Sequence, residues 1–203
     1  MTLDGVSENQ PIKPISLIDQ QLTYYSSFLS PITANHYFEL LLKDINWQQE
    51  TITLYGKKIK VPRLVGWHGD EGKSYVYSGV NHQPEAWTNG LKEIKELIEN
   101  YTGHAFNSVL LNLYRNGQDS MGWHSDDEPE LGDQPVIASV SLGAERLFKV
   151  RYKNDHQLNH DVRLSNGSIL LMSGDLQRDW QHQIPKTKQL VTPRINLTFR
   201  QIL

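Results

Sequence analysis

The stretch Pro193-Arg194-Ile195-Asn196-Leu197-Thr198-Phe199-Arg200 decides the fold class. In a strand, successive side chains point to opposite faces. Ile195, Leu197 and Phe199 then share one face, which we expect to join the core. The polar side chains share the other face: Arg194, Asn196, Thr198 and Arg200. On periodicity alone this face either meets solvent or forms a wall that binds an anionic ligand.

The residues before this stretch predict more strands of the same kind. Short β-rich runs are separated by turn residues such as Asn116-Gly117, Asn154-Asp155 and Asn166-Gly167. Strands at this spacing, with no helix between them, are typical of an all-β core. The expected strands cover residues 107–114, 135–142, 146–152, 161–164, 168–172, 181–184 and 194–201.

Two helices are predicted before these strands. The first begins at Ser30-Pro31, because serine is a good N-cap and proline suits the first helical position. The second runs from about Pro84 to Tyr101, and Gly103 can end it. Their apolar stripes are interpreted as core: Phe38, Leu41, Leu42 and Ile45 in the first, and Trp87, Leu91, Ile94, Leu97, Ile98 and Tyr101 in the second.

Composition predicts one globular domain over residues 1–203, with residues 1–14 as a flexible lead-in. The sequence has no 18-residue apolar run, and residues 1–10 do not resemble a signal peptide. We therefore expect a protein that is not secreted and not bound to a membrane, cytoplasmic or, in a eukaryote, nuclear. The absence of cysteine excludes a disulfide framework and any thiolate metal site.

Bulk charge argues mildly against a protein that grips nucleic acid nonspecifically, since the net charge is −3 and the isoelectric point is about 6.2. Two basic runs could still form local basic faces, or they could be solvated strands or loops. They are Lys57, Lys58, Lys60 and Arg63, and Arg146, Lys149, Arg151 and Lys153.

A metal site is indicated by His124-Ser125-Asp126 and the distant His182. Two imidazoles and one carboxylate are the ligands of the facial triad of non-haem Fe(II) oxygenases. Guanidinium groups bind carboxylates bidentately, so Arg194 and Arg200 could hold the two ends of 2-oxoglutarate. A zinc hydrolase on the same three ligands is an alternative, but it gives the arginines no role. The pair His156 and His160 lies in a predicted turn and is not expected to bind metal.

The segment from about Thr53 to Leu203 resembles the AlkB family of Fe(II)/2-oxoglutarate dioxygenases, closest to its duplex-acting DNA-repair branch. The matching pieces follow one another in the family's order and spacing. They are Tyr75-Val-Tyr-Ser-Gly79, Phe106-Asn-Ser-Val-Leu-Leu-Asn-Leu-Tyr114, His124-Ser-Asp-Asp-Glu128, Ile137-Ala-Ser-Val-Ser-Leu-Gly143, His182 and Pro193–Arg200.

The resemblance implies an α+β, mainly β fold. This is a double-stranded β-helix, or jelly roll, over residues 106–203, with two helices packed on one sheet and a β-rich nucleotide-recognition lid over residues 51–80. It also implies a dioxygenase that uses Fe(II), with 2-oxoglutarate and O2 as cosubstrates. The implied metal ligands are His124, Asp126 and His182. The implied 2-oxoglutarate residues are Asn112, Tyr114, Arg194, Asn196, Thr198 and Arg200, with Tyr114 and Arg194 at the distal carboxylate and Asn196 and Arg200 near the metal end.

Substrate contacts are carried over in the same way. The lid residues Tyr75, Tyr77 and Ser78 would hold a flipped base, with Tyr77 on one face and the ring of His124 on the other. Asp127 would accept a hydrogen bond from the exocyclic amine of the base, or else orient a ligand or Arg200. In the hairpin turn, Tyr55 would fill the vacated stack, and Lys57 and Lys58 would hold phosphates. The same turn also reads as an ordinary hairpin.

The implied function is oxidative demethylation of N1-methyladenine and N3-methylcytosine in DNA, with decarboxylation of 2-oxoglutarate to succinate and release of formaldehyde. The expected partner is alkylated DNA, with RNA also open, and no obligate protein partner is evident. Two alternatives remain: the same chemistry on methylated RNA or a protein side chain, and a jelly-roll binding module without catalysis.

Overall fold

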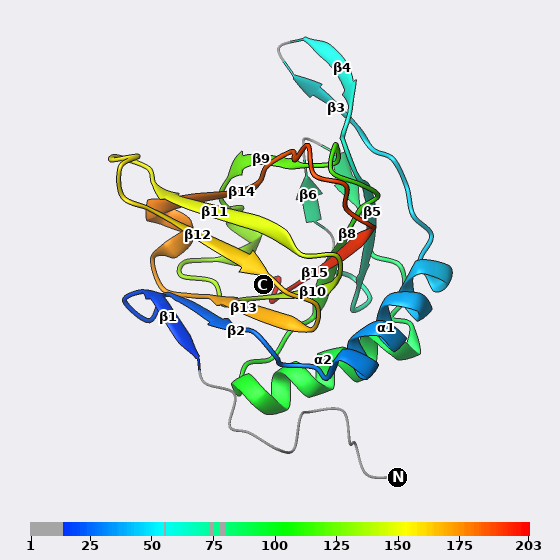
Figure 1. The fold of residues 1–203 in the computed structure, drawn as a ribbon. Helices are drawn as coiled ribbons and strands as arrows, with labels where there is room; N and C mark the ends of the chain where they lie inside the picture. Colours follow the sequence, from blue (N-terminus) through cyan, green and yellow to red (C-terminus); the bar gives the residue numbers. More distant parts are fainter. Residues whose placement is uncertain (1–13, 55, 74, 78–79) are drawn as a thin grey trace.

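Two antiparallel sheets form the body of the protein in the computed structural model, which describes residues 14–54, 56–73, 75–77 and 80–203 (Figure 1). The major sheet has the strand order β1-β2-β13-β10-β15-β8-β5, and the minor sheet β12-β11-β14-β9. The major strands are β1 (Ile15–Ile18), β2 (Leu22–Tyr25), β13 (Ser168–Met172), β10 (Ile137–Gly143), β15 (Arg194–Arg200), β8 (Ser108–Tyr114) and β5 (Leu64–Gly69). The minor strands are β12 (Asn159–Leu164), β11 (Arg146–Tyr152), β14 (Trp180–Ile184) and β9 (Met121–His124).

The two sheets pack face to face, and two helices cover the outer face of the major sheet (Figure 1). Between the sheets, Ile137 and Leu170 of the major sheet join one apolar cluster with Phe148 and Val150 of the minor sheet. On the other side, α1 (Pro31–Asp44) and α2 (Asn89–Thr102) pack against the major sheet in a second cluster. This arrangement confirms the predicted jelly roll with two helices on one sheet.

Strand β15 occupies the place that its alternation predicted. Its apolar residues Ile195, Leu197 and Phe199 are fully buried in the cluster on the helix side. Its polar face is also buried, so the solvent-facing alternative is wrong. Pairing sets Tyr114 opposite Arg194 and Asn112 opposite Asn196 on one side, and Ser141 and Ser139 opposite Asn196 and Thr198 on the other. Three neighbouring strands therefore share one continuous polar wall.

The first helix begins where its cap predicted, since the Ser30 hydroxyl accepts a hydrogen bond from the Thr33 amide at 3.1 Å. The predicted start of the second helix was wrong by several residues. Thr88 is its N-cap, and the residues before it are extended, because the Glu85 amide donates to the Trp67 carbonyl at 2.9 Å. Trp87 therefore precedes the helix. Gly103 ends it with φ +72, as expected.

The predicted strands after residue 106 lie within two residues of the observed ones, but the major sheet is wider than expected. Strands β1 and β2 extend one edge, and β5 pairs with β8 at the other. Strand β5 falls inside residues 51–80, the predicted lid. That region is therefore two hairpins with a sheet strand between them. The hairpins are β3 (Thr51–Leu54) with β4 (Lys57–Lys60), and β6 (Tyr75–Tyr77) with β7 (Val80–His82).

The β3–β4 hairpin projects from the body of the protein, beyond the edge of the major sheet (Figure 1). Lys57, Lys58 and Lys60 on β4 are exposed. The two remaining short elements are the 3-10 helix η1 (Pro129–Leu131) and the helix α3 (Leu176–Asp179). None of the helices in the described ranges is both long and apolar enough to cross a bilayer.

Candidate active site

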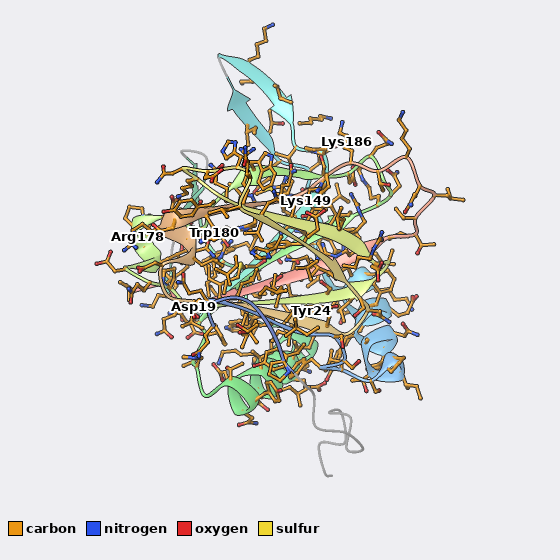
Figure 2. The ribbon with its side chains drawn as sticks, turned by 60° about the vertical axis from the view of Figure 1, so that its left-hand side comes forward. Asp19, Tyr24, Lys149, Arg178, Trp180 and Lys186 are labelled. Carbon is orange, nitrogen blue, oxygen red and sulfur yellow. The ribbon has the colours of Figure 1, made fainter. Side chains whose placement is uncertain are left out.

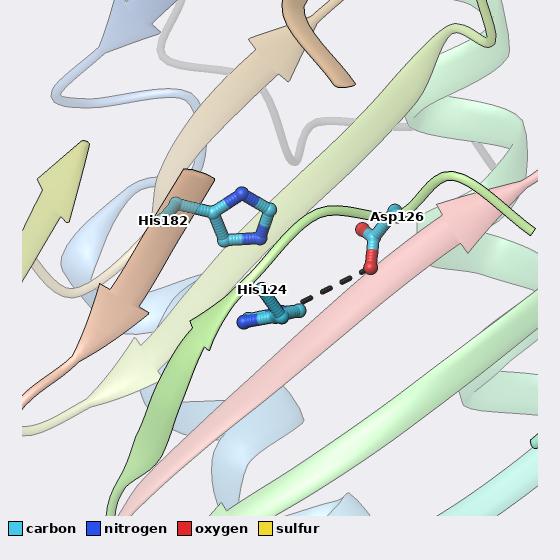
Figure 3. A group of neighbouring side chains, drawn as sticks. All are labelled: His124, Asp126 and His182. Carbon is cyan, nitrogen blue, oxygen red and sulfur yellow. Dashed lines mark ion pairs between the residues drawn. The ribbon is translucent and has the colours of Figure 1, made fainter. Parts of the chain in front are cut away.

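The three predicted metal ligands meet at the paired ends of β9 and β14. His124 is the last residue of β9, Asp126 follows two residues later, and His182 lies opposite His124 in the register of β14. One potential ligand atom from each residue lies within 4.8 Å of the others (Figure 3). Among the described residues, this is the one group of three or more His, Cys, Asp and Glu side chains that could hold an ion.

The orientation of the His124 ring and the protonation state of the His182 ring both suit metal binding. The Nδ1 atom of His124 lies 2.8 Å from the Gly122 carbonyl oxygen, to which it can donate. Its Nε2 atom, 3.9 Å from Asp126 Oδ1, is then left as the ligand. His182 is buried and stacks on Phe148, with ring centroids 5.2 Å apart. Burial lowers the pKa of His182 to about 3, with a further contribution from His124, so its ring is neutral, as metal binding requires.

Asp126 is buried and ionised, and both its carboxylate and its backbone amide are hydrogen-bonded. Arg200 Nη2 donates to Asp126 Oδ1 at 2.8 Å, and the Asp126 amide donates to Gln177 Oε1 at 2.9 Å. Burial raises the pKa of Asp126, but the charge of Arg200, with smaller contributions from the two histidines, lowers it to about 2. The sequence held no signal for Gln177, which lies on α3, 51 positions away from Asp126.

We expect Gln177→Ala to weaken metal binding without unfolding the protein. The substitution removes the acceptor that fixes the backbone of Asp126, and losing such an outer partner typically costs about 10–100-fold in metal affinity. Calorimetric titration with Fe(II) under anaerobic conditions measures the change. A matched control is Gln157→Ala, an exposed glutamine in the turn before β12. Equal affinities of the Gln177→Ala variant and the unchanged protein would remove Gln177 from this role.

A cavity of about 50 Å³ joins the triad to the polar wall of the major sheet. Five of the six predicted 2-oxoglutarate residues line it: Asn112, Tyr114, Asn196, Thr198 and Arg200. All five are at least 92% buried, which excludes a polar pair or face in solvent. Within the wall, Asn196 Oδ1 accepts from Ser139 Oγ at 3.0 Å and Asn196 Nδ2 donates to Thr198 Oγ1 at 2.7 Å.

The sixth residue, Arg194, is fully buried next to two cavity residues. Its Nη2 atom donates to Ser141 Oγ and to Asn196 Oδ1, each at 2.9 Å, and its Cζ atom lies 5.2 Å from the ring centroid of Tyr114. Asn196, expected near Arg200 at the metal end, therefore also contacts Arg194. Burial lowers the pKa of Arg194 to about 10, so the group stays charged at neutral pH.

Two nitrogens of this buried cation, Nε and Nη1, have no hydrogen-bond partner among the described residues. A buried charge without a counter-charge is costly, and a carboxylate that accepts a hydrogen bond from one of these two donors would supply that counter-charge. The residues present therefore fit a cosubstrate that carries a carboxylate away from the metal, as 2-oxoglutarate does.

The two basic runs are not uniformly solvated. Arg63 is buried, and its Nε atom donates to Asn112 Oδ1 at 2.6 Å, so it supports the wall from the chain after β4. Arg146 is also buried. Lys149, in contrast, lies on the outer face of the minor sheet and pairs with Asp161 at 2.7 Å (Figure 2). Arg63 and Arg146 therefore belong neither to a solvated stretch nor to an exposed basic face, and both predicted alternatives are wrong for these two residues.

The predicted substrate residues are only partly brought to the cavity. His124 lines it, with its side chain 26% exposed. The side chain of Asp127 is 60% exposed, contacts Lys153 Nζ at 3.4 Å and does not line the cavity. Tyr75 and Tyr77 lie on β6, whose backbone alone is described. Tyr55 and Ser78 lie outside the described residues.

Comparisons with known proteins agree on one family. The model of the 2OG-Fe(II) oxygenase superfamily matches residues 21–200. The alpha-ketoglutarate-dependent dioxygenase alkB homolog 3 of Bos taurus is 44% identical over 178 residues, which cover 83% of this chain and 62% of that protein. Its Homo sapiens counterpart is 42% identical over 187 residues, with 88% and 65% covered.

Two further comparisons extend this result. The DNA oxidative demethylase ALKBH2 of Homo sapiens is 35% identical over 189 residues, which cover 88% of this chain and 72% of that protein. The solved structure of OsALKBH1 has the same fold, with a TM-score of 0.65 at 17% identity, over 93% of this chain and 100% of that one. The chain spans slightly less than two thirds of the length of the alkB homolog 3 proteins that it matches.

Proposed function

We propose that this chain, which belongs to the 2OG-Fe(II) oxygenase superfamily and within it to the AlkB family, removes methyl groups from alkylated bases in DNA by oxidation. The observation that carries the proposal is one cavity that joins the His124, Asp126 and His182 triad to a wall ending at the unsatisfied Arg194. A binding module without catalysis would need neither part.

In this proposal the triad holds Fe(II), and the wall holds 2-oxoglutarate. Bound Fe(II), with 2-oxoglutarate and O2, supplies the oxidising power for hydroxylating a methyl C–H bond, and succinate and carbon dioxide are released. Arg194 and Tyr114 bind the distal carboxylate, with Asn112 beside them. Arg200 keeps Asp126 ionised and oriented through its hydrogen bond. The burial of the wall excludes water from the cosubstrate.

The preferred lesions are N1-methyladenine and N3-methylcytosine, and the hydroxylated methyl group leaves as formaldehyde. Both bases are cationic, and Asp127 follows the ligand Asp126 at the surface, where its carboxylate is open to a base. Its contact with Lys153 is the competing interaction. Tyr75, Tyr77 and Ser78 complete the base pocket, with Tyr77 stacking opposite the His124 ring. Asp127→Asn should then reduce activity on these two lesions more than on bases without an exocyclic amine at the recognised edge.

A panel of oligonucleotides tests the substrate class. Each carries one methylated base, in DNA or RNA, and is given to the protein with Fe(II), 2-oxoglutarate and O2, with products identified by mass. We expect demethylated DNA from the N1-methyladenine and N3-methylcytosine strands. Turnover restricted to RNA would replace DNA as the substrate. Cosubstrate consumption with no demethylated nucleic acid would contradict the proposal.

We also propose that the enzyme acts on duplex DNA, with Tyr55 filling the stack that the flipped base leaves and with Lys57 and Lys58 on phosphates. Support comes from the projecting β3–β4 hairpin, whose lysines are exposed. Opening a paired base costs a few kcal/mol, so a wedge helps only where there is a stack to refill. Tyr55→Ala should therefore slow demethylation of a duplex lesion, by about tenfold or more, and spare the same lesion in a single strand.

Lysine substitutions provide the matched control for this test. Lys57→Ala and Lys58→Ala should weaken binding to both kinds of strand and flatten the salt dependence, because they remove phosphate contacts. Equal slowing of both substrates by Tyr55→Ala would assign Tyr55 to the hairpin structure and leave duplex preference without support.

A further inference from the structure

Arg146 is a buried arginine that neither the metal site nor the wall uses. It is the first residue of β11 and is 3% exposed. Its guanidinium donates to three backbone carbonyls: Nη1 to Asn116 at 3.2 Å, and Nη2 to Asp119 at 2.9 Å and Pro185 at 2.7 Å. These carbonyls belong to the chain after β8 and the chain after β14. Arg146 therefore ties together two loops at the end of the cavity formed by Tyr114.

The same guanidinium contacts the ring of Tyr114. The Cζ atom of Arg146 lies 5.5 Å from the ring centroid, and that of Arg194 lies 5.2 Å from it. A cation within about 6 Å of an aromatic ring is attracted to it. One cavity-lining ring thus contacts two buried cations, and the charge of Arg146 is near enough to contribute to the lowered pKa of Arg194.

This end of the cavity carries positive charge without a bound carboxylate. The hydrogen bonds of Arg146 and Arg194 within the described ranges go to carbonyls, a hydroxyl and an amide. Asp119 is hydrogen-bonded to Arg115, at 2.7 and 2.9 Å, and its charge also partly compensates that of Arg146. Asp126, the one carboxylate among the cavity-lining residues, is taken by Arg200. An anionic group from the cosubstrate would therefore meet Arg194, which has no acid beside it among the described residues, and the partly compensated charge of Arg146 behind the Tyr114 ring.

We propose that Arg146 is a positioning residue that makes the cavity select a 2-oxo acid with a second carboxylate over one whose far end is neutral. The inference rests on the proposed function, since it requires the distal end of 2-oxoglutarate to lie at Tyr114. Arg146 acts through Tyr114, whose ring it holds against Arg194, and through its own charge.

The expected size of the effect follows from Coulomb's law. Two unit charges up to about 10 Å apart, in a partly buried site with an effective dielectric constant of about 20, change a binding constant by about tenfold. A 2-oxo acid with a neutral far end gains nothing from the charge of Arg146. Removing that charge should therefore reduce the selectivity by the same factor. Arg146→Met keeps the length of the stem and removes the charge, whereas Arg146→Lys keeps the charge and loses the planar group.

The test measures binding rather than turnover. Anaerobic titration calorimetry of the Fe(II)-loaded protein gives the affinities for 2-oxoglutarate and for 2-oxoglutaramate, in which an amide replaces the distal carboxylate. We expect Arg146→Met to lower the ratio of these affinities about tenfold and Arg146→Lys to keep most of it. The matched control is Arg163→Met on the neighbouring strand β12, whose side chain is 68% exposed, and it should leave the ratio unchanged.

An unchanged ratio in folded Arg146→Met would overturn the inference. If Arg146→Met does not fold, the Arg146→Lys variant decides. This variant keeps the charge and must therefore keep the selectivity. A collapsed ratio of affinities in Arg146→Lys would show that the charge of residue 146 is not the source of the selectivity. Failure of the proposed cosubstrate site looks different: the unchanged protein would then bind neither ligand, whereas failure of the Arg146 inference alone leaves tight and selective binding of 2-oxoglutarate. Failure of the proposed substrate is separate again, because it appears in the oligonucleotide panel and leaves these affinities as they are.

Discussion

His182→Ala should abolish demethylation while the protein remains folded. The residue is one of the three proposed metal ligands, it lies on β14 whereas His124 ends β9 and Asp126 follows it, and His124 is the one other histidine among the residues that line the cavity. Losing one of three protein ligands removes both affinity and geometry from the metal site. The same outcome is expected for His124→Ala and Asp126→Ala. Turnover with Fe(II) and metal content after dialysis are the two measurements.

The third histidine of the minor sheet provides the control for this prediction. His160 on β12 has its ring centroid 5.9 Å from that of Trp180 and does not line the cavity. His160→Ala should keep both metal and turnover. Near-normal activity in any one of the three ligand variants would remove that residue from the metal site.

Arg194→Ala should raise the requirement for 2-oxoglutarate by about two to four decades. Breaking a buried ion pair by removing one partner costs roughly 3–5 kcal/mol, and about 1.4 kcal/mol corresponds to one decade in affinity. Arg194→Lys should rescue only part of this loss, because lysine cannot bind a carboxylate bidentately or bond Ser141 and Asn196 in the same plane.

The dependence of the initial rate on 2-oxoglutarate concentration measures this effect, and thermal melting checks the fold. Arg163→Ala is the control, because this arginine lies at the surface of β12, 3.3 Å from Glu145. If Arg194→Ala shows the cosubstrate dependence of the unchanged protein, Arg194 does not hold the distal carboxylate.

Strand β15 shows which features could be predicted from the sequence. Its alternation separated a core face from a polar face without further information. Alternation could not tell whether the polar face meets solvent, because burial depends on what lies across from it. In the fold, the minor sheet covers that face. A buried polar face was favoured only because the sequence also contains two histidines and one carboxylate that could hold a metal, at positions well before this strand.

Other residues could not be placed because their environment is set by distant chain segments. Arg63 and Arg146 occur among lysines and look like surface charges, yet both are buried. Their side chains form hydrogen bonds to residues at least 27 positions away in the sequence, and Arg146 also contacts the ring of Tyr114 on another strand. Strand β5, with two glycines, has weak strand propensity, and pairing with β8 is what orders it. The start of α2 was misplaced because Pro84 resembles a first helical residue, whereas Thr88 is the cap.

The most direct test of the account is a stoichiometric one. Anaerobically prepared Fe(II) protein receives 2-oxoglutarate and a DNA oligonucleotide with one N1-methyladenine, and O2 is then admitted while oligonucleotide mass, succinate and formaldehyde are measured together. We predict an oligonucleotide lighter by one methylene unit, with equal amounts of succinate and formaldehyde, and no product from Asp126→Ala. Loss of the methyl group without succinate, or succinate formed while the methyl group stays in place, would contradict the account.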